Sequence, residues 1–404
     1  MSHHRIFQLE CGVMSYDWGQ KGELSLVAQL AGLKHIDRAA SYAELWMGVH
    51  PNCPSRVIEE SGSYLSEVIK RDPSLLGEYV TQRWGELPFL LKILSIDKPL
   101  SIQAHPDKSL ADTLHRKDPE NYPDSNHKPE IAVALSELQL LYGLNKQLSV
   151  QKIIEVYPNI EEVLIDAVSS ASGSYQNNLA EVGAQELLKA LISTPQNQID
   201  KLLMKIEKGL SQKIGFTDEN QKLFLNQFSI YPSDIGLIFI LFMNLMVLNP
   251  DDGLYLGPHQ LHAYLYGDLA ECMANSDNVI RAGMTKKYKD LNTLKSMIDR
   301  QNHSMDPLCR KKSKDFTTCY ESPAEEFEIH KIDLPKSRTQ KYLKPDVPEI
   351  LIILSGIGNL ESADRSYLLE KGTILFVGAG QDYAISATED LKAIRGTVPV
   401  LTGV

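Results

Sequence analysis

The sequence predicts a mainly β protein in which a helical block separates two β-rich regions. Up to about Leu144, short β-prone runs such as residues 89–94 alternate with Pro, Gly, Asn and Asp, which is typical of a sandwich or barrel. Between about Gln147 and Leu248, glycine becomes sparse and apolar residues recur at helical intervals. From about Asp251 strand and turn patterns resume. With 404 residues, the chain is long enough for roughly two to four packed units.

The helical block contains the longest apolar stretch of the chain, residues 235–248. Pro232, Ser233 and Asp234 provide a good helix start before it, and Asn249-Pro250 provides a stop, so we expect one buried helix. The stretch is shorter than the ~20 residues needed to span a bilayer, which argues against a membrane segment. Two further helical series are Ile153, Ile154, Val156, Tyr157 and Leu187, Leu188, Leu191, Ile192.

A last β unit begins near Glu321. It contains the apolar runs 350–354 and 374–377, each followed by a turn with glycine. We therefore expect a first β unit made of residues 1–146 and 249–320, a helical insert over 147–248, and a smaller β domain over 321–404.

Composition and charge narrow the class of function. The net charge of -11 argues against nucleic acid as a partner, because no basic surface is available to neutralise a run of phosphates. The cysteines are odd in number and widely spaced, without a CxxC pair, which favours a reducing compartment. Without a recognisable secretion signal, we expect a cytoplasmic protein. The five cysteines are Cys11, Cys53, Cys272, Cys309 and Cys319.

Four side chains form a candidate metal site. Gln103 and His105 are two residues apart and project from one face of a predicted strand. Glu130 stands before the apolar run 131–135, at a strand entrance, and His262 adds a second imidazole from a distant segment. Such oxygen and nitrogen donors suit zinc with an open coordination position, or iron, manganese or cobalt. The spacing by itself is not diagnostic, since a single Gln or His more often has an ordinary packing role.

A series of motifs gives this site a context. They are YDWG at 16–19, YAELWMG at 42–48, SIQAHP at 101–106, NHKPE at 126–130, HAY at 262–264 and ECMANSDNVIRAG at 271–283. In this order, with matching blocks from residue 16 to about residue 290, the motifs resemble those of type I phosphomannose isomerases.

The resemblance implies a cupin-type jelly-roll catalytic core, an inserted α-helical domain and a second, C-terminal cupin-like β domain. It implies reversible isomerisation of mannose 6-phosphate and fructose 6-phosphate through an enediol, with one zinc ion per chain held by Gln103, His105, Glu130 and His262. The only partner implied is a small sugar phosphate; neither nucleic acid, a membrane nor an obligate protein partner is expected. The product would supply sugar nucleotides such as GDP-mannose, or mannose would enter glycolysis.

The resemblance also assigns roles around the metal. It implies that Arg281 reaches into the active site, while His127, Glu271 and Asp277 are candidates for the proton carrier, with Asp277 more suited to orienting Arg281. Charge-assisted bonds are what a phosphate needs. The substrate-binding candidates are Ser101, Lys128, Tyr264 and Lys287, and we expect Trp18, Glu44 and Trp46 to serve packing or support.

The sequence departs from the family pattern at two places. His259 precedes the HAY motif, where we prefer His262 as the ligand and expect His259 at the surface, and Lys286 stands where proline is usual. Two other classes remain open: a sugar-binding or storage cupin without turnover, and an iron oxygenase. The last domain has no histidine after His330 and no apparent cluster of histidine with carboxylates, so we expect no metal there.

Overall fold

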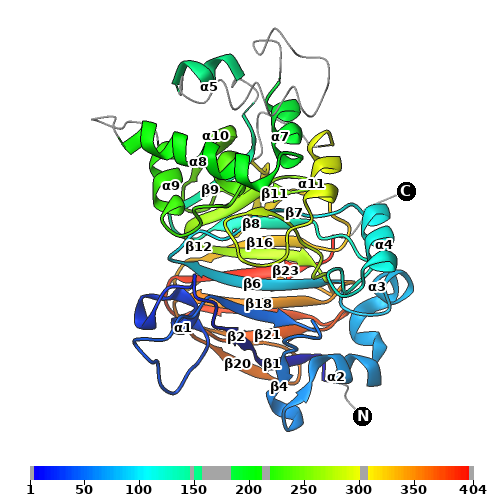
Figure 1. Cartoon of the computed structure of the whole chain (residues 1–404). Coiled ribbons are helices and arrows are strands. Elements are labelled where there is room, and N and C mark those ends of the chain that lie inside the picture. The colour runs from blue at the N-terminus through cyan, green and yellow to red at the C-terminus, as the bar shows by residue number, and fades with distance from the viewer. Residues whose placement is uncertain (1–3, 146–149, 157–182, 212–218, 301–307, 400–404) are drawn as a thin grey trace.

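The computed structural model describes residues 4–145, 150–156, 183–211, 219–300 and 308–399. The predicted helical position Tyr157 and the predicted boundary at Gln147 lie outside these ranges. Three β-sheets are stacked, and helices gather at one end of the stack (Figure 1). The mainly β prediction with a helical region is confirmed. No helix among the described residues combines the length and apolar character that a membrane crossing requires.

The ten-stranded sheet carries the candidate site. Its main path runs β10-β9-β12-β6-β3-β2, and β7, β8, β11 and β13 attach beside β12. The strands are β2 (Gly12–Met14), β3 (Glu44–Gly48), β6 (Phe89–Ile96), β7 (Ile102–Ala104), β8 (Glu130–Ala134), β9 (Leu138–Leu144), β10 (Met243–Leu248), β11 (Gly253–Leu256), β12 (His262–Ala274) and β13 (Ile280–Gly283).

A nine-stranded sheet joins the two ends of the chain. Its order is β14-β15-β16-β23-β18-β21-β1-β4-β5, so the first strand pairs with β21 and Ile6 lies opposite Val377. The strands are β1 (Ile6–Glu10), β4 (Arg56–Val57), β5 (Ser63–Tyr64), β14 (Lys311–Lys314), β15 (Thr317–Tyr320), β16 (Glu328–Leu334), β18 (Glu349–Ser355), β21 (Ile374–Val377) and β23 (Leu391–Thr397).

A four-stranded sheet of order β17-β22-β19-β20 covers the outer face of the nine-stranded sheet. Because β18 is covered on both faces, its apolar run is continuous: Ile350 and Ile352 face the ten-stranded sheet, and Leu351 and Ile353 face the four-stranded one. The strands are β17 (Thr339–Tyr342), β19 (Gly358–Glu361), β20 (Ser366–Leu369) and β22 (Tyr383–Ala387).

The helices fall into two groups. One group flanks the sheets, and the other forms the helical region, which shares a second hydrophobic core with strands of the ten-stranded sheet. The flanking helices are α1 (Leu26–Leu30), α2 (Leu65–Arg71), α3 (Gly77–Arg83) and α4 (Lys108–Lys117), with the 3-10 helices η1 (Gly22–Leu24), η2 (Ile58–Glu60) and η3 (Pro73–Leu76). The helical region holds α5 (Val150–Val156), α7 (Ala184–Ile192), α8 (Gln196–Ser211), α9 (Glu219–Phe228), α10 (Gly236–Phe242) and, from later in the chain, α11 (Leu291–Ile298).

The three apolar runs predicted as strands are confirmed, but the prediction of one buried helix over residues 235–248 is wrong for the second half of that stretch. The runs 89–94, 350–354 and 374–377 lie in β6, β18 and β21. Of the apolar stretch 235–248, only α10 is helical; from Met243 onward the chain is β10, which pairs antiparallel with β9. An apolar run suits a buried helix and a buried strand equally well, and the open edge of β9 decides in favour of the strand.

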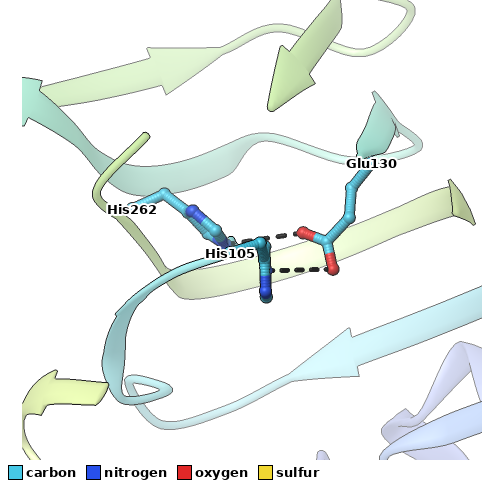
Figure 2. A group of neighbouring side chains, drawn as sticks. All are labelled: His105, Glu130 and His262. Atoms are coloured by element: carbon cyan, nitrogen blue, oxygen red, sulfur yellow. Dashed lines mark ion pairs between the residues drawn. The ribbon is translucent and has the colours of Figure 1, made fainter. Parts of the chain in front are cut away.

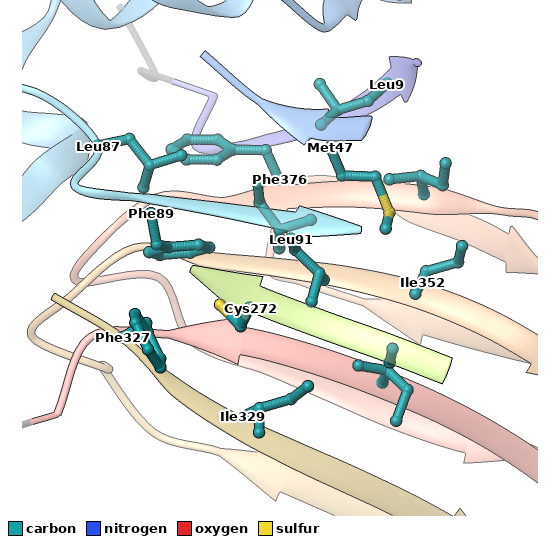
Figure 3. Close-up of a cluster of buried hydrophobic side chains, with 14 of the residues drawn as sticks. Leu9, Met47, Leu87, Phe89, Leu91, Cys272, Phe327, Ile329, Ile352 and Phe376 are labelled. Carbon is teal, nitrogen blue, oxygen red and sulfur yellow. The ribbon is translucent and has the colours of Figure 1, made fainter. Parts of the chain in front are cut away.

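A large hydrophobic core lies between the ten-stranded and nine-stranded sheets (Figure 3). Phe89 and Leu91 of β6 and Cys272 of β12 meet Ile352 and Phe376 of the facing sheet, and all five side chains are fully or nearly fully buried. Burial of this area is the main stabilising term for the stack, at about 25 cal/mol for each Å² of apolar surface.

The same alternation places charged side chains on the opposite face of the ten-stranded sheet. Successive residues of a strand point to opposite faces. Since Leu91 and Ile93 face the core, Lys92 faces away from it, and Glu271 faces away because Ala270 and Cys272 face the core. Lys92 lies directly opposite Glu271 on β12. A row of ionisable groups is therefore fixed by strand register.

A contact between two glycines fixes the helical region against the sheet. A Cβ atom added to Gly283 of β13 would lie 2.1 Å from the Cα atom of Gly236, the first residue of α10. The carboxylate of Asp234 accepts a hydrogen bond from the backbone N–H of Gly236 at 2.7 Å. Only glycine permits such a close approach, which anchors α10 two residues from Arg281.

Candidate active site

Three potential metal ligands come from three neighbouring strand ends. His105 follows directly after β7, Glu130 opens β8, and His262 opens β12. Cross-strand pairing completes the arrangement, because Gln103 of β7 lies opposite both His262 of β12 and Arg281 of β13. Strand ends placed side by side thus gather residues that are far apart in the sequence.

The ligand atoms converge on one point (Figure 2). The donor atoms of His105, Glu130 and His262 all lie within 4.8 Å of one another, and all three residues are buried. His105 Nε2 is 3.3 Å from Glu130 Oε1, and His262 Nε2 is 3.5 Å from Glu130 Oε2. The amide of Gln103 is 3.4 Å from His262 Nε2, and a half-turn of that amide would present its oxygen instead.

Hydrogen bonds fix both imidazoles in the tautomer that binds a metal. Nδ1 of His105 donates to the carbonyl oxygen of Asn278 at 3.0 Å, and Nδ1 of His262 donates to that of Gln260 at 3.0 Å. Each ring therefore presents an unprotonated Nε2 toward Glu130. His105 Nε2 and Glu130 Oε2 are buried without a hydrogen-bond partner. Buried polar atoms are normally satisfied, so these orphan atoms fit a metal ion.

The charge states also suit metal binding. Burial, more than any nearby charge, lowers the pKa of His105 to about 4, which keeps its ring neutral. Burial alone would raise the pKa of Glu130, but its neighbours, among them the Lys128 ammonium at 3.1 Å, hold it well below its usual range. The site therefore offers a neutral His105 imidazole and an ionised carboxylate near neutral pH, as a divalent cation requires.

A cavity of about 820 Å³ opens beside the ligands, and Gln103 and Glu130 line it. Arg281, Lys98 and Lys287 line its wall, and the described residues provide no ion pair for any of these three cations. Burial lowers the pKa of Arg281 slightly, and the guanidinium remains charged. Unpaired cations on a cavity wall favour an anionic ligand.

A second charged group lies deeper on the same sheet face. Lys92 Nζ is 3.5 Å from Glu44 Oε2 and 3.4 Å from Glu271 Oε1, and it lies over the ring of Trp46. The hydroxyl of Tyr264 donates to Glu271 Oε2 at 3.1 Å. All five residues line the cavity.

Glu271 is the titratable group of this cluster. Burial and then the charge of Glu130 raise the pKa of Glu271 to about 7, against the opposing effect of Lys92. The two carboxylates raise the pKa of Lys92, which burial would otherwise lower, so the ammonium stays charged. A carboxyl group that titrates near neutral pH can both accept and release a proton.

The structure brings most of the predicted site residues to the cavity. Ser101, Lys128, Tyr264, Glu271, Asp277, Arg281 and Lys287 all line it, as do Trp18, Glu44 and Trp46. Lys128 Nζ is 3.1 Å from Glu130 Oε1, so this lysine already has a partner beside the metal ligands. Among the residues that the structure describes, Asp277 makes no ion pair with Arg281; its carboxylate contacts His50 and Asn52 instead.

His127 lies apart from these residues. Its Nε2 is 2.7 Å from Glu326 Oε1, and the ring is absent from the cavity wall. The structure therefore does not bring this proton-carrier candidate to the ligands.

His259 differs from expectation in one respect. It is buried rather than exposed at the surface, because its Nε2 pairs with Asp107 Oδ2 at 2.8 Å and its backbone N–H donates to the carbonyl of His105. The ring is thereby directed to Asp107, and it is His262 that joins the ligand cluster.

The C-terminal strands hold a cluster that the sequence analysis missed. Cys319 of β15 lies opposite His330 of β16, and Glu328 is on the same face, so three donor atoms lie within 4.8 Å. The expectation that this region lacks histidine grouped with a carboxylate was wrong. The Arg395 guanidinium donates to Nδ1 of His330, which leaves the ring proton on Nε2. This tautomer and the adjacent cation disfavour a metal there.

Several other cavity residues escaped sequence analysis. Lys92 could have been noticed, because it is the one charged residue in the mainly apolar strand β6. Lys98 follows the same strand and had no motif to mark it. Gln227, Ile230 and Tyr231, at and after the end of α9, also line the cavity. They reach the cavity only because of the way the helical region packs against the sheet, and no local sequence pattern indicates that packing.

Fold and site together define a class: a β-sheet protein with a buried histidine–carboxylate cluster that could hold a metal ion beside a cation-lined cavity. Comparisons with known proteins are specific. Residues 6–147 match the family model for the type I phosphomannose isomerase catalytic domain. Mannose-6-phosphate isomerase 1 of Arabidopsis thaliana is 36% identical over 98% of this chain and 94% of its own length. Human mannose-6-phosphate isomerase is 34% identical over 98% of this chain and 99% of its own length.

Solved structures agree with this match. The apo form of mannose 6-phosphate isomerase from Salmonella typhimurium is 26% identical, has a TM-score of 0.80, and is matched over 98% of this chain and 100% of that one. A zinc-bound mannose 6-phosphate isomerase superposes with a TM-score of 0.79 at the same identity and coverage. The chain belongs to the type I phosphomannose isomerase family.

Proposed function

We propose that this chain is a mannose-6-phosphate isomerase, which interconverts mannose 6-phosphate and fructose 6-phosphate through an enediol with one zinc ion per chain. The observation that carries the proposal is the buried His105–Glu130–His262 cluster, with two unsatisfied ligand atoms, beside a cavity walled by unpaired cations. Relatives that match over nearly the whole chain bear the name of this enzyme.

We propose Gln103, His105, Glu130 and His262 as the zinc ligands. A zinc-bound relative supports the choice of metal, and the fixed tautomers of both imidazoles support the ligand set. When bound, zinc supplies Lewis-acid polarisation of the sugar oxygens. Lys128, at 3.1 Å from Glu130, would hold that carboxylate in place and lie close to the sugar.

Glu271 is the side chain best suited to carry the proton between the two carbons. Without a bound metal, burial raises its pKa to about 7, and its second oxygen is oriented by the Tyr264 hydroxyl. Lys92 keeps the ionised form accessible despite burial. Asp277 remains a second candidate. The position of His127 gives it a supporting role instead, through Glu326.

Arg281 would stabilise the negative charge that develops on the enediol oxygens, because it reaches the cavity opposite Gln103 and has no carboxylate partner among the described residues. Lys287, Lys98 and Ser101 would hold the phosphate at the cavity wall. A phosphate fixed at one end of the cavity would place the other end of the open-chain sugar near the metal ligands.

We also propose the finer architecture that the family implies. The catalytic cupin-type domain would comprise residues 1–146 and 249–320, the inserted helical domain 147–248, and the C-terminal cupin-like domain 321–404. The stacked antiparallel sheets support a cupin-type design. A cytoplasmic location remains a prediction, which the five unpaired cysteines favour.

The test is turnover of mannose 6-phosphate before and after chelation, followed by addition of zinc. Loss of turnover on chelation and recovery with zinc would establish reaction and metal together. Zinc binding without turnover under any divalent metal would instead identify a sugar-binding protein. Turnover that survives complete removal of metal, verified by elemental analysis, would contradict the assigned ligand set.

A further inference from the structure

A second histidine–carboxylate pair lies on the cavity wall, away from the metal ligands. His50 stands two residues after β3, and its side chain is 2% exposed. Its Nε2 is 3.5 Å from Oδ1 of Asp277, whose side chain is 33% exposed and lines the cavity. The imidazole thus lies behind the carboxylate, which separates it from the space that a sugar would occupy.

The hydrogen bonds of His50 fix the direction of its proton. The backbone N–H of Asn52 donates to Nδ1 at 3.4 Å, so Nδ1 is the acceptor and the ring proton lies on Nε2. Nε2 is the ring nitrogen that lies near Asp277, at 3.5 Å from Oδ1. The protonated nitrogen thus faces the carboxylate at ion-pair distance, and a small approach on substrate binding would let it donate.

Asp277 is held from three sides. The side-chain amide of Asn52 donates to Oδ2 at 2.7 Å, while His50 approaches Oδ1. The backbone N–H of Asp277 donates to Oδ2 of Asp124 at 2.8 Å, which fixes the loop itself. A carboxylate has about four lone-pair positions, so one on each oxygen stays available toward the cavity.

This degree of constraint is more than a loop carboxylate needs for folding. A carboxylate that simply faces solvent gains little from two oriented donors, whereas one that must bind a sugar hydroxyl in a single geometry requires them.

We infer that His50 is a positioning residue for the isomerase reaction: with Asn52, it orients the Asp277 carboxylate so that it accepts a hydroxyl of the bound sugar phosphate. The inference rests on the proposed function. His50 does not touch the substrate and acts only through Asp277.

A packing role is the competing explanation. The ring of His50 meets the indole of Trp46 edge-on, with 5.0 Å between centroids. Phenylalanine at position 50 would keep this contact and remove the donor, whereas glutamine would place an amide N–H near the position of Nε2. His50→Phe and His50→Gln therefore separate the two roles.

The experiment measures kcat and KM for mannose 6-phosphate in zinc-loaded wild type, His50→Phe, His50→Gln, Asp277→Asn and the double variant His50→Phe/Asp277→Asn. We expect kcat of His50→Phe to fall about 10- to 100-fold, with KM changed less and with unaltered zinc content, and His50→Gln to retain most of the turnover. The double variant should be no slower than Asp277→Asn alone, because the two residues act as one unit.

Three outcomes would overturn the inference: full turnover in His50→Phe, equal losses in the Gln and Phe variants, or losses that multiply in the double variant. Thermal unfolding of each variant identifies any that fail to fold, and Asn52→Leu then tests the second donor to the same carboxylate. A wild-type protein without isomerase turnover would refute the proposed function as well. An active wild type with an active His50→Phe variant would refute the inference alone.

Discussion

Replacement of Lys92 by methionine should shift the pH dependence of turnover toward higher pH. Lys92 Nζ is 3.4 Å from Glu271 Oε1, and its charge is the main influence that opposes the raised pKa of that carboxyl. Methionine keeps much of the buried volume and removes the charge. If ionised Glu271 takes the proton from the sugar, a higher pKa means that less of the enzyme is active at a given pH.

The size of the shift follows from the geometry. Two unit charges about 4 Å apart interact by about 4 kcal/mol at an effective dielectric constant of 20. One pKa unit corresponds to about 1.4 kcal/mol, so the upper limit is about three units. Rearrangement and water entry reduce this value, and we expect the acid limb of the kcat profile to move upward by at least about one unit.

The assay is kcat against pH in zinc-loaded protein, with elemental analysis and thermal unfolding to verify metal and fold. Glu44→Gln is the matched variant of opposite sign, because the charge of Glu44 raises the pKa of Glu271 and its removal should move the limb downward. Lys98→Met removes a cavity cation outside this cluster and should raise KM without moving the limb. An unmoved acid limb in folded, zinc-loaded Lys92→Met would refute Glu271 as the proton carrier.

Three further predictions concern single side chains. Arg281→Ala should fold and retain zinc but lose at least about 100-fold in kcat, as expected for a charge-stabilising group; full activity would remove Arg281 from the mechanism. Glu130→Gln should hold less than one zinc per chain by elemental analysis, because the anionic ligand is lost; an undiminished zinc content would contradict the ligand set. His127→Gln should keep turnover within about threefold, since its ring faces Glu326 rather than the cavity; a 100-fold loss would return His127 to the proton-carrier role.

The sequence predicted the parts of the fold that depend on local composition. The run 350–354 is a strand because β-branched and leucine side chains fill both faces of a covered sheet, and this is visible in the residues themselves. The pairing of Ile6 with Val377 joins opposite ends of the chain and has no local signal. For the same reason, the end of α10 at Phe242 could not be predicted, since the partner strand β9 lies far away in sequence.

In the candidate site, too, motifs predicted some residues, whereas contacts that depend on tertiary structure could not be predicted. Motifs marked His105, Glu130 and His262, and strand ends placed side by side brought them together. Sequence could not reveal that Asp107 holds His259, or that Cys319 faces His330, because both contacts depend on tertiary structure or strand register. Lys92 escaped notice because it lies on the cavity face of a strand whose other face is core, whereas Gln227, Ile230 and Tyr231 reach the cavity from the end of α9.

Metal binding and the protonation of Glu271 should be coupled. The charge of Glu130 is the second cause, after burial, of the raised pKa of Glu271. A divalent cation on Glu130 reverses the sign of the nearby charge and must lower that pKa. Burial keeps His105 neutral and its neighbours keep Glu130 ionised, so these two ligands have no proton to release near pH 7.

Zinc binding at pH 7 should therefore release a fraction of a proton from Glu271. Calorimetric titration of the metal-free protein with zinc, in buffers of different ionisation enthalpy, measures this number directly. The released fraction should decline toward zero as the pH rises well above 7, because Glu271 is then already ionised, and it should vanish in Glu271→Gln. Release that persists undiminished in Glu271→Gln would show that the proton comes from another group and that the two carboxylates are not coupled.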